Sequence, residues 1–381
     1  MKILFTGGGT GGHIFPIIAI VQELKKQASF GNTKTQFFFV GPNSNLGTDL
    51  LKQEQVTIKT ISAGKIRRYI TPQSILQNIR DICFKIPIGL VQGYFVTKNI
   101  APDIIFSKGG YGAVPVMSAA KILKIPFFLH ESDAAPGKAT QKFAKQAIMI
   151  FSSFRINLPG IDKEKIIITG NPTRKNFFQG NAEKGRELFG LSDEKPVVLI
   201  LGGSQGATRI NDLVLQTLPL VLNDFEVIHQ CGEKNIKTMD AVTATIIENQ
   251  DWLKNYHPIG FLNDIELAHA LAASHIVLSR AGAGAIFEIA AAGKPSVLIP
   301  LPEAAQNHQA TNAYAYSHTG AAEVMGPQNP TPHMLSSLLR QLFSRPERLR
   351  EMSEAAKRFA RPEAAQTIAE YLLEFVKQEK Q

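Results

Sequence analysis

Short apolar runs recur along the chain and alternate with longer segments that have helical patterning. The runs in the first half predict strands at residues 3–6, 37–41, 58–62, 103–107, 127–130, 147–151 and 166–169. They are rich in isoleucine, valine and phenylalanine, which is typical of strands buried on both faces of a parallel sheet. Because strands alternate with helices, we expect right-handed βαβ units in a doubly wound sheet.

The same rhythm restarts in the second half of the chain. Apolar runs predict further strands at 197–201, 226–230, 258–261, 276–279 and 296–300, after an interruption by polar residues near Asn171 and at 179–184. We therefore predict an α/β protein with two doubly wound, Rossmann-like domains, 1–170 and 171–350. A helical tail, 351–381, is expected to pack back toward the first domain, with its helix broken or kinked at Pro362.

A glycine-rich turn follows the first predicted strand of each half. The first is GGGTGG at 7–12, in which Gly7, Gly9 and Gly12 have the G-x-G-x-x-G spacing, and the second is GGSQG at 202–206. Glycine lets the backbone turn sharply and approach a ligand, and the following helix presents free N–H groups to an anion. The turns therefore predict phosphate or pyrophosphate binding, with a turn used only for helix packing as the alternative.

A dinucleotide site is a weaker interpretation of the first turn. It would require an acidic residue about 20 positions further on, at the end of the second strand, to bind the ribose. That strand ends in FFVGP at 38–42, which contains no acid. The sequence therefore argues against an NAD-linked oxidoreductase.

His13 closes the first glycine turn and is the first candidate for a chemical step. The positive potential of a helix N-terminus disfavours an imidazolium. We therefore expect this side chain to be neutral near pH 7 and able to accept a proton. A histidine that makes only structural hydrogen bonds is the alternative.

Other polar residues follow predicted strands, where open α/β sheets bind their ligands. SKGGYG at 107–112 brings a second glycine backbone, Tyr111 and Lys108, which can pair with a phosphate, and in HESD at 130–133 Glu131 either contacts a ligand or holds its loop. In the second half Glu288 is placed to accept hydrogen bonds from a ribose diol, and QNHQATN at 306–312 carries amides and an imidazole that recognise sugar hydroxyls. An exposed helical glutamate and a solvated loop are the alternatives.

The segment 65–102 interleaves basic and apolar residues, and Ile75, Ile79 and Ile82 fall on one helical face. A basic and apolar helix pair indicates docking to an anionic membrane surface. The alternative is an ordinary core helix with a solvated basic face. The residues predicted to dock are Arg67, Arg68, Ile75, Ile79, Ile82 and Lys85.

Composition narrows the class of protein. Of the 381 residues 44% are hydrophobic, enough for a sizeable core, and the formal charge of +9 suits anionic partners, although solubility alone also explains it. The two cysteines, Cys83 and Cys231, lie far apart, and the sequence contains no D-x-D, H-E-x-x-H or Cys/His cluster, so neither a disulfide framework nor a metal site is predicted. The first residues form a strand and not a signal peptide, and no apolar run is long enough to span a bilayer, so we expect a cytosolic protein.

Taken together, these motifs resemble the bacterial UDP-N-acetylglucosamine–N-acetylmuramyl-(pentapeptide) pyrophosphoryl-undecaprenol N-acetylglucosamine transferases, the MurG family. The matching motifs follow the family's order over nearly the whole chain: GGGTGGH at 7–13, GGY at 109–111, HE at 130–131 with PG at 136–137, TGNPTR at 169–174, GGSQG at 202–206, SRAGA at 279–283 with Glu288, and HQ at 308–309 with NA at 312–313. One departure is HESD at 130–133, where the family usually has HEQN. The added acid, Asp133, is unfavourable beside a pyrophosphate.

The resemblance implies a GT-B fold, in which two Rossmann-like domains face an interdomain cleft. It implies an inverting transfer of GlcNAc from UDP-GlcNAc to the C4 hydroxyl of MurNAc in lipid I, without metal or cofactor, which gives lipid II for peptidoglycan synthesis. It also implies a peripheral protein on the cytoplasmic face of the bacterial plasma (inner) membrane. The implied partners are UDP-GlcNAc, lipid I and that anionic surface, with no nucleic acid.

The resemblance also assigns residues, with His13 as the general base in a turn that seats the acceptor pyrophosphate. The implied acceptor site comprises Gly8, Gly9, Thr10, Gly109, Gly110, Tyr111, His130 and Glu131. The implied donor site comprises Thr10, Gly11, Gly12, Asn171, Arg174, Ser204, Gln205, Phe261, Leu262, Ala283, Glu288, His308 and Gln309.

Two other functions share parts of this pattern. An enzyme like UDP-GlcNAc 2-epimerase has the same nucleotide site but needs no lipid acceptor. A non-catalytic nucleotide-sugar-binding or membrane-tethering protein would bind UDP-GlcNAc without releasing UDP. The basic and apolar segment and the triple-glycine turn favour the transferase.

Overall fold

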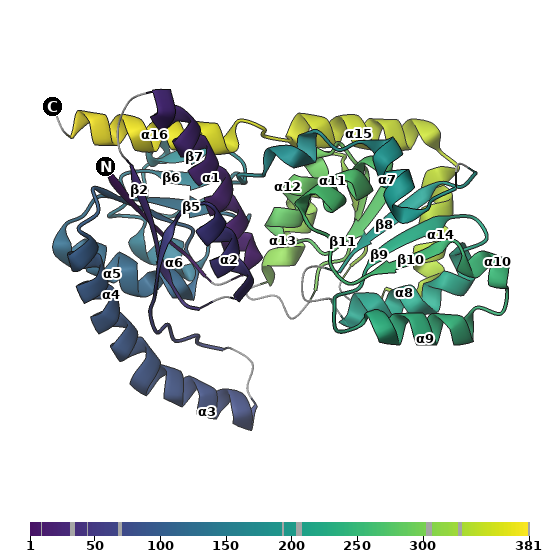
Figure 1. Ribbon diagram of the computed structural model, residues 1–381, viewed down its shortest axis with the longest axis horizontal. Helices are drawn as coiled ribbons and strands as arrows, with labels where there is room; N and C mark the ends of the chain where they lie inside the picture. The colour runs from purple at the N-terminus through teal and green to yellow at the C-terminus, as the bar shows by residue number, and fades with distance from the viewer. Residues whose placement is uncertain are drawn as a thin grey trace. The chain divides into compact units, whose positions relative to one another are not determined.

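The chain forms two compact α/β units (Figure 1). The computed structural model describes residues 1–8, 10–30, 35–43, 45–67, 71–192, 194–202, 208–301, 307–326 and 330–379. Unit 1 consists of Met1–Arg174 and Glu363–Gln381, and unit 2 consists of Lys175–Pro362. Each unit contains one parallel sheet, which confirms the predicted fold class.

The sheet of unit 1 has the strand order β3-β2-β1-β4-β5-β6-β7. All of its strands lie where the apolar runs predict them. The order reverses between β1 and β4, and such a switch point is where open α/β sheets bind ligands. The strands are β1 (Lys2–Thr6), β2 (Gln36–Gly41), β3 (Thr57–Thr60), β4 (Ile104–Ser107), β5 (Phe127–Glu131), β6 (Ile150–Ser152) and β7 (Ile166–Ile168).

Helices cover both faces of this sheet. Ile3 and Phe5 of β1 pack with α1 (Gly11–Phe30) and α16 (Ala364–Gln378), whereas Leu4 packs on the opposite face with α5 (Val114–Leu123). Successive side chains of a strand point to opposite faces, so a sheet covered on both faces needs apolar residues at every position. This explains why the strand runs in the sequence are continuous.

An arm joins β3 to β4 in unit 1. It comprises residues 65–67, α3 (Pro72–Arg80), a π-helix (Asp81–Lys85) and α4 (Ile86–Ile100). Figure 1 shows α3 projecting away from the sheet, while α4 packs against α5. The remaining helices of the unit are α2 (Asn45–Gln53) and α6 (Lys138–Phe143).

The sheet of unit 2 has the strand order β10-β9-β8-β11-β12-β13. Strands β8 (Val197–Leu201), β9 (Glu226–Gln230), β10 (Tyr256–Ile259), β11 (Ile276–Ser279) and β12 (Ser296–Leu298) match the predicted runs. Strand β13 (Ala322–Val324) was not predicted, because three residues with a central glutamate make no apolar run. The helices are α7 (Ala182–Phe189), α8 (Thr208–Val221), α9 (Ile236–Ile246), α10 (Gln250–Leu253), α11 (Asp264–Ala273), α12 (Ala283–Ala291), α13 (His308–Ser317), α14 (Pro332–Phe343) and α15 (Pro346–Phe359).

The C-terminal segment is shared between the two units. Helix α15 packs against α12 and α14 of unit 2, and the chain returns to unit 1 at Glu363. The helix ends at Phe359 and α16 begins at Ala364, so Pro362 lies in the break that a proline predicts. Helix α16 packs against α1, and its Phe375 meets Phe128 edge-on with ring centroids 5.5 Å apart.

None of the helices of the described residues is both long enough and apolar enough to cross a membrane.

Candidate active site

Two glycine turns meet at the switch point of unit 1. Strands β1 and β4 are paired neighbours, with Thr6 opposite Ser107, and the Lys108 amide donates to the Thr6 carbonyl at 2.9 Å. The turn after β1 leads into α1, and the turn after β4 leads through Gly109 and Gly110 to Tyr111. The sheet therefore brings Gly8 and Thr10 of the first turn and Gly109, Gly110 and Tyr111 of the second to one edge.

His13 lies in the first turn of α1, packed between two glycines. A Cβ atom on Gly8 would lie 2.9 Å from the Nδ1 atom of the ring, and one on Gly110 would lie 3.1 Å from Nε2. Gly110 also has a φ of +74°, a left-handed conformation that favours glycine. Close approach to the imidazole therefore explains a glycine at both positions.

The imidazole of His13 is neutral at pH 7. Burial and then the charge of Lys108 lower its pKa to about 4. The sequence predicts a neutral ring from its place at a helix start, but the structure assigns the effect mainly to loss of solvent. The Thr10 hydroxyl lies 3.0 Å from Nδ1 and orients the ring.

Lys108 is a buried cation beside this turn, only 3% exposed. Its ammonium donates to His130 Nδ1 at 2.7 Å, Ser132 Oγ at 2.7 Å and Asn171 Oδ1 at 3.2 Å. Burial lowers the pKa of Lys108 to about 7, although the charges of Glu131 and Asp133 raise it. From the sequence we predict only that Lys108 can pair with a phosphate, and this hydrogen-bond network is not predicted. The one hint in the sequence is Ser132 in HESD, because its hydroxyl can accept a hydrogen bond from a lysine.

The side chains of His130 and Glu131 are occupied by protein groups. His130 Nε2 lies 3.2 Å from the Gly170 carbonyl and must donate to it, so Nδ1 is the acceptor for Lys108. Burial, followed by the charge of Lys108, holds the pKa of His130 well below its usual range. Glu131 accepts hydrogen bonds from Thr140 Oγ1 at 2.6 Å and Gly137 N at 2.8 Å, so it holds the loop after β5.

The last predicted donor residues of unit 1 follow β7. Asn171 is 2% exposed and bonds to Lys108, as described above. The guanidinium of Arg174 stacks over the Phe15 ring of α1, with Cζ 4.0 Å from the centroid. Both side chains are thus fixed near the first glycine turn.

The predicted donor residues of unit 2 follow three of its strands. Phe261 and Leu262 come after β10, and Leu262 is buried in the core between α11 and the sheet. Ala283 begins α12 after β11, and Glu288 lies on the same helix. His308 and Gln309 begin α13 after β12.

Two hydrogen bonds order this edge of unit 2. The Gln309 side-chain carbonyl accepts from the Leu301 amide at 3.0 Å, and Asn312 Nδ2 donates to the Ala281 carbonyl at 3.2 Å. They tie α13 to the ends of β12 and β11. Of the predicted site residues, Gly9, Arg68, Ser204 and Gln205 lie outside the described residues.

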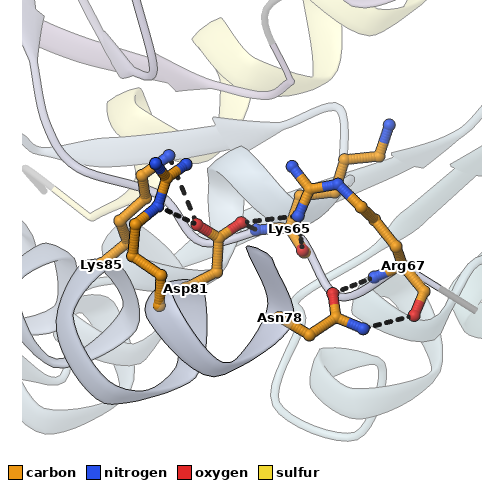
Figure 2. Close-up of polar contacts among 6 residues, drawn as sticks. Lys65, Arg67, Asn78, Asp81 and Lys85 are labelled. Atoms are coloured by element: carbon orange, nitrogen blue, oxygen red, sulfur yellow. Dashed lines mark hydrogen bonds and ion pairs between the residues drawn. The ribbon is translucent and has the colours of Figure 1, made fainter. Parts of the chain in front are cut away.

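The base of the arm is held together by Asp81, which is 1% exposed (Figure 2). Its Oδ2 accepts from Arg67 Nη1 at 2.9 Å and from the Lys65 amide at 3.1 Å, and Lys85 Nζ lies 3.3 Å from Oδ1. Burial raises the pKa of Asp81, but these hydrogen bonds and the Lys85 charge outweigh it and leave the pKa below its usual value. Asn78 adds two bonds to the Arg67 backbone, at 2.9 and 2.8 Å.

The arm exposes many large apolar side chains. Ile75, Ile79 and Ile82 are 48%, 53% and 49% exposed, which excludes the alternative of an ordinary core helix. We call the exposed set the apolar surface of the arm. It comprises Ile66, Ile75, Leu76, Ile79, Ile82, Phe84, Ile88, Leu90, Val91 and Phe95.

Sequence comparisons identify the family. Residues 3–152 match the glycosyltransferase family 28 N-terminal domain, and residues 197–368 match the C-terminal domain of the same family. A Treponema denticola relative named UDP-N-acetylglucosamine–N-acetylmuramyl-(pentapeptide) pyrophosphoryl-undecaprenol N-acetylglucosamine transferase is 34% identical over 391 residues, covering 98% of this chain and 97% of the relative. The chain belongs to this family of glycosyltransferases.

Solved structures agree with this family. A crystal structure of MurG from Acinetobacter baumannii has a TM-score of 0.72 at 25% identity, covering 98% of this chain and 99% of that one. UDP-GlcNAc 2-epimerase from Neisseria meningitidis, bound to UDP-GlcNAc, has a TM-score of 0.66 at 17% identity, covering 98% and 100% of the two chains, and this likeness concerns the fold alone. The predicted GT-B fold and the prediction of an N-acetylglucosaminyltransferase are confirmed.

The part of the chain that the structure describes contains no group of three or more His, Cys, Asp or Glu side chains able to hold a metal ion.

Proposed function

We propose that this glycosyltransferase moves GlcNAc from UDP-GlcNAc to the C4 hydroxyl of MurNAc in lipid I, giving lipid II for peptidoglycan synthesis. The observation that carries the proposal is a neutral His13 packed between Gly8 and Gly110 at the switch point of unit 1. The names of the relatives support the two substrates. An uncharged imidazole in a glycine-lined anion site can accept a proton from a bound hydroxyl.

In the proposed reaction the acceptor binds unit 1 with its pyrophosphate at the glycine turns. His13 accepts the proton of the C4 hydroxyl as its oxygen bonds to the anomeric carbon of GlcNAc. The bond from that carbon to UDP breaks with inversion, and UDP leaves with the electron pair. Helix N-termini and arginine stabilise the leaving group in place of a metal ion.

The donor is assigned to unit 2. Glu288 on α12 accepts hydrogen bonds from the ribose diol, and His308 and Gln309 at the start of α13 face the sugar. Support comes from their shared origin at the carboxyl ends of adjacent strands β11 and β12, where doubly wound sheets bind nucleotides. Arg174, together with Ser204 and Gln205, is assigned to the diphosphate.

The arm is assigned to membrane docking, on the anionic cytoplasmic face of the plasma membrane. Its apolar surface supplies side chains that gain free energy by leaving water, as in an interfacial helix. Arg67 and Lys85 are assigned a supporting part, because both bind Asp81 within the arm. A peripheral location follows, with the acceptor's lipid in the same bilayer.

The test measures UDP release from UDP-GlcNAc with and without a lipid I analogue, and identifies the sugar products. Release that depends on the analogue supports the transferase. Formation of UDP-ManNAc from UDP-GlcNAc alone would support the epimerase, and binding without UDP release would support a non-catalytic protein.

His13→Ala tests the base. We expect kcat to fall by at least about 100-fold, the usual contribution of general base catalysis, with an unchanged unfolding midpoint. Full turnover by a folded His13→Ala enzyme would rule out this role. Ile122→Ala on α5, an exposed side chain outside the site, is the control.

A further inference from the structure

Lys108 is a buried cation whose direct acceptors are all uncharged. Its three donated hydrogen bonds go to His130 and Ser132 at the end of β5 and to Asn171 after β7. The His130 ring is neutral, because Nε2 carries a proton and donates to the Gly170 carbonyl, while Nδ1 carries none and accepts from Lys108. The ammonium is therefore fixed in place by groups that do not cancel its charge.

Glu131 and Asp133 are the acids whose charges act on Lys108. Glu131 gives its two oxygens to Thr140, Gly137 and the Asp133 amide. Asp133 and Glu131 raise the pKa of Lys108 through their charges, yet burial outweighs them. A buried cation with incomplete compensation favours binding of an anion nearby.

The Lys108 side chain begins beside the first glycine turn. A Cβ atom on Gly7 would be 3.3 Å from the Cβ of Lys108 and 3.3 Å from the Cβ of His13, so only this glycine separates the two side chains. His13 and Lys108 therefore both begin beside Gly7, in the turn that we assign to the acceptor pyrophosphate, and the charge of Lys108 acts on the His13 ring.

We propose that Lys108 is a positioning residue of the acceptor site, whose fixed positive charge is balanced by the pyrophosphate of the acceptor when it binds. This proposal rests on the proposed function. Burial is the main cause that keeps His13 unprotonated, and the charge of Lys108 adds to it.

Proton uptake follows from this arrangement. The groups that face Lys108 are His13 from α1 and His130, Glu131 and Asp133 from β5 and its loop. With a pKa of about 7, Lys108 is partly deprotonated in the free enzyme at slightly alkaline pH. The acceptor dianion favours the charged form, so acceptor binding weakens as pH rises above 7.

The experiment compares Lys108→Met, Lys108→Arg and wild type over a range of pH, with Lys121→Met as control. Lys121 is an exposed lysine of α5 outside the site. We expect Lys108→Met to raise the acceptor KM by about 10–100-fold and to leave the donor KM unchanged, as for loss of one charged contact. In the Lys108→Met enzyme the fall of kcat/KM on the acid side should begin at higher pH, because the pKa of His13 rises when the neighbouring positive charge is removed.

Lys108→Arg should rescue acceptor binding and remove the alkaline rise in acceptor KM, because arginine does not lose its proton. Calorimetry of the acceptor analogue in two buffers of different ionisation enthalpy should show proton uptake by wild type and none by either variant. If neither variant folds, the wild-type acceptor KM alone must rise above pH 7 while the donor KM stays flat.

UDP release by wild type tests the proposed function, whereas the acceptor KM of Lys108→Met tests the role of Lys108. If wild type releases no UDP with the lipid I analogue, the proposed function fails. If wild type is active and Lys108→Met keeps the acceptor KM and both limbs of the pH profile, Lys108 has only a structural part and the inference is overturned.

Discussion

Asp81 and Lys108 are both buried in unit 1, at 1% and 3% exposure, but their charges are balanced differently. Asp81 is bound by the cations Arg67 and Lys85 and by a backbone amide. Lys108 is bound by an imidazole, a hydroxyl and an amide carbonyl, all of them neutral. One pKa shifts in favour of the charged form, and the other shifts against it.

The difference separates a structural ion from one that serves a ligand. Asp81 and its cations neutralise one another inside the protein, so their effect is to fix the start of the arm against the π-helix. Lys108 donates its hydrogen bonds to neutral groups, at the edge of the sheet where we propose that the acceptor pyrophosphate binds. Removing Asp81 should therefore cost stability, and removing Lys108 should cost acceptor binding.

The largest effect is expected at the apolar surface of the arm. Because Arg67 and Lys85 are engaged by Asp81, apolar side chains carry most of the docking energy. Ile75→Glu with Ile79→Glu should weaken binding to anionic phospholipid vesicles by about 30–100-fold, as two half-exposed isoleucines contribute about 2–3 kcal/mol on burial. Vesicle sedimentation measures this change.

The control for this double variant is Ile122→Glu on α5, which is 66% exposed and outside the arm. It adds one negative charge to the same unit, against two in the double variant, and should change vesicle binding by less than about threefold. Equal losses in both proteins would show that net charge, and not the apolar surface, controls docking.

The next effect concerns the stability of the arm. Asp81→Asn removes the charge that Arg67 and Lys85 share and should lower the free energy of unfolding by about 1–3 kcal/mol. The two cations can turn to solvent, which keeps the loss below that of a fully enclosed pair. Urea denaturation measures it, with Asp49→Asn as control.

Asp49 pairs with Lys52 at 3.7 Å, and both side chains are exposed. Its substitution should cost less than about 0.5 kcal/mol, as is usual for a surface ion pair. An Asp81→Asn protein as stable as Asp49→Asn would end the assignment of Asp81 as a structural ion, and acceptor KM should be unchanged in both.

The pH dependence of stability should separate the two ions by sign. The folded pKa of Asp81 is depressed, so its contribution is present above the unfolded pKa and is lost as pH falls through the folded pKa. Lys108 has a folded pKa of about 7 against an ordinary 10.5, so its buried charge destabilises the fold at low pH, and this cost is relieved as pH rises from 7 toward 10.5. Above pH 7.5 the free energy of unfolding of wild type, relative to that of Lys108→Met, should therefore increase by about 1 kcal/mol per pH unit.

Urea midpoints of wild type and both variants at pH 4, 7 and 9 measure these differences, and other titrating groups cancel in each comparison. Asp81→Asn should approach wild type at the acid end, whereas Lys108→Met should fall behind wild type at the alkaline end. Parallel curves for Lys108→Met would mean that Lys108 is not desolvated.

Asp81 and Lys108 also show which features of the structure can be predicted from the sequence and which cannot. The strands of unit 1 and five of those of unit 2 could be predicted, because a sheet covered on both faces needs continuous apolar runs. His13 and the glycine turns could be placed because each follows such a run. The bonds from Arg67 to Asp81 and from Lys108 to Asn171 could not be predicted, because they join residues 14 and 63 positions apart through side-chain geometry that no periodicity encodes.

The smallest effect is expected from substituting Ser132, one of the three hydrogen-bond acceptors of the Lys108 ammonium. Ser132 accepts from the ammonium at 2.7 Å and lies 3.4 Å from Asn171 Oδ1. Ser132→Ala removes a bond that favours the charged lysine, so the alkaline rise in acceptor KM should begin at lower pH. At pH 7 the acceptor KM should rise by only about two- to fivefold, because water can replace part of a hydroxyl's contribution of about 1 kcal/mol. Ser153→Ala removes a buried hydroxyl just after β6 and should leave the pH profile of the acceptor KM unchanged. An equal shift of the profile in both variants would show that Lys108 does not cause the pH dependence.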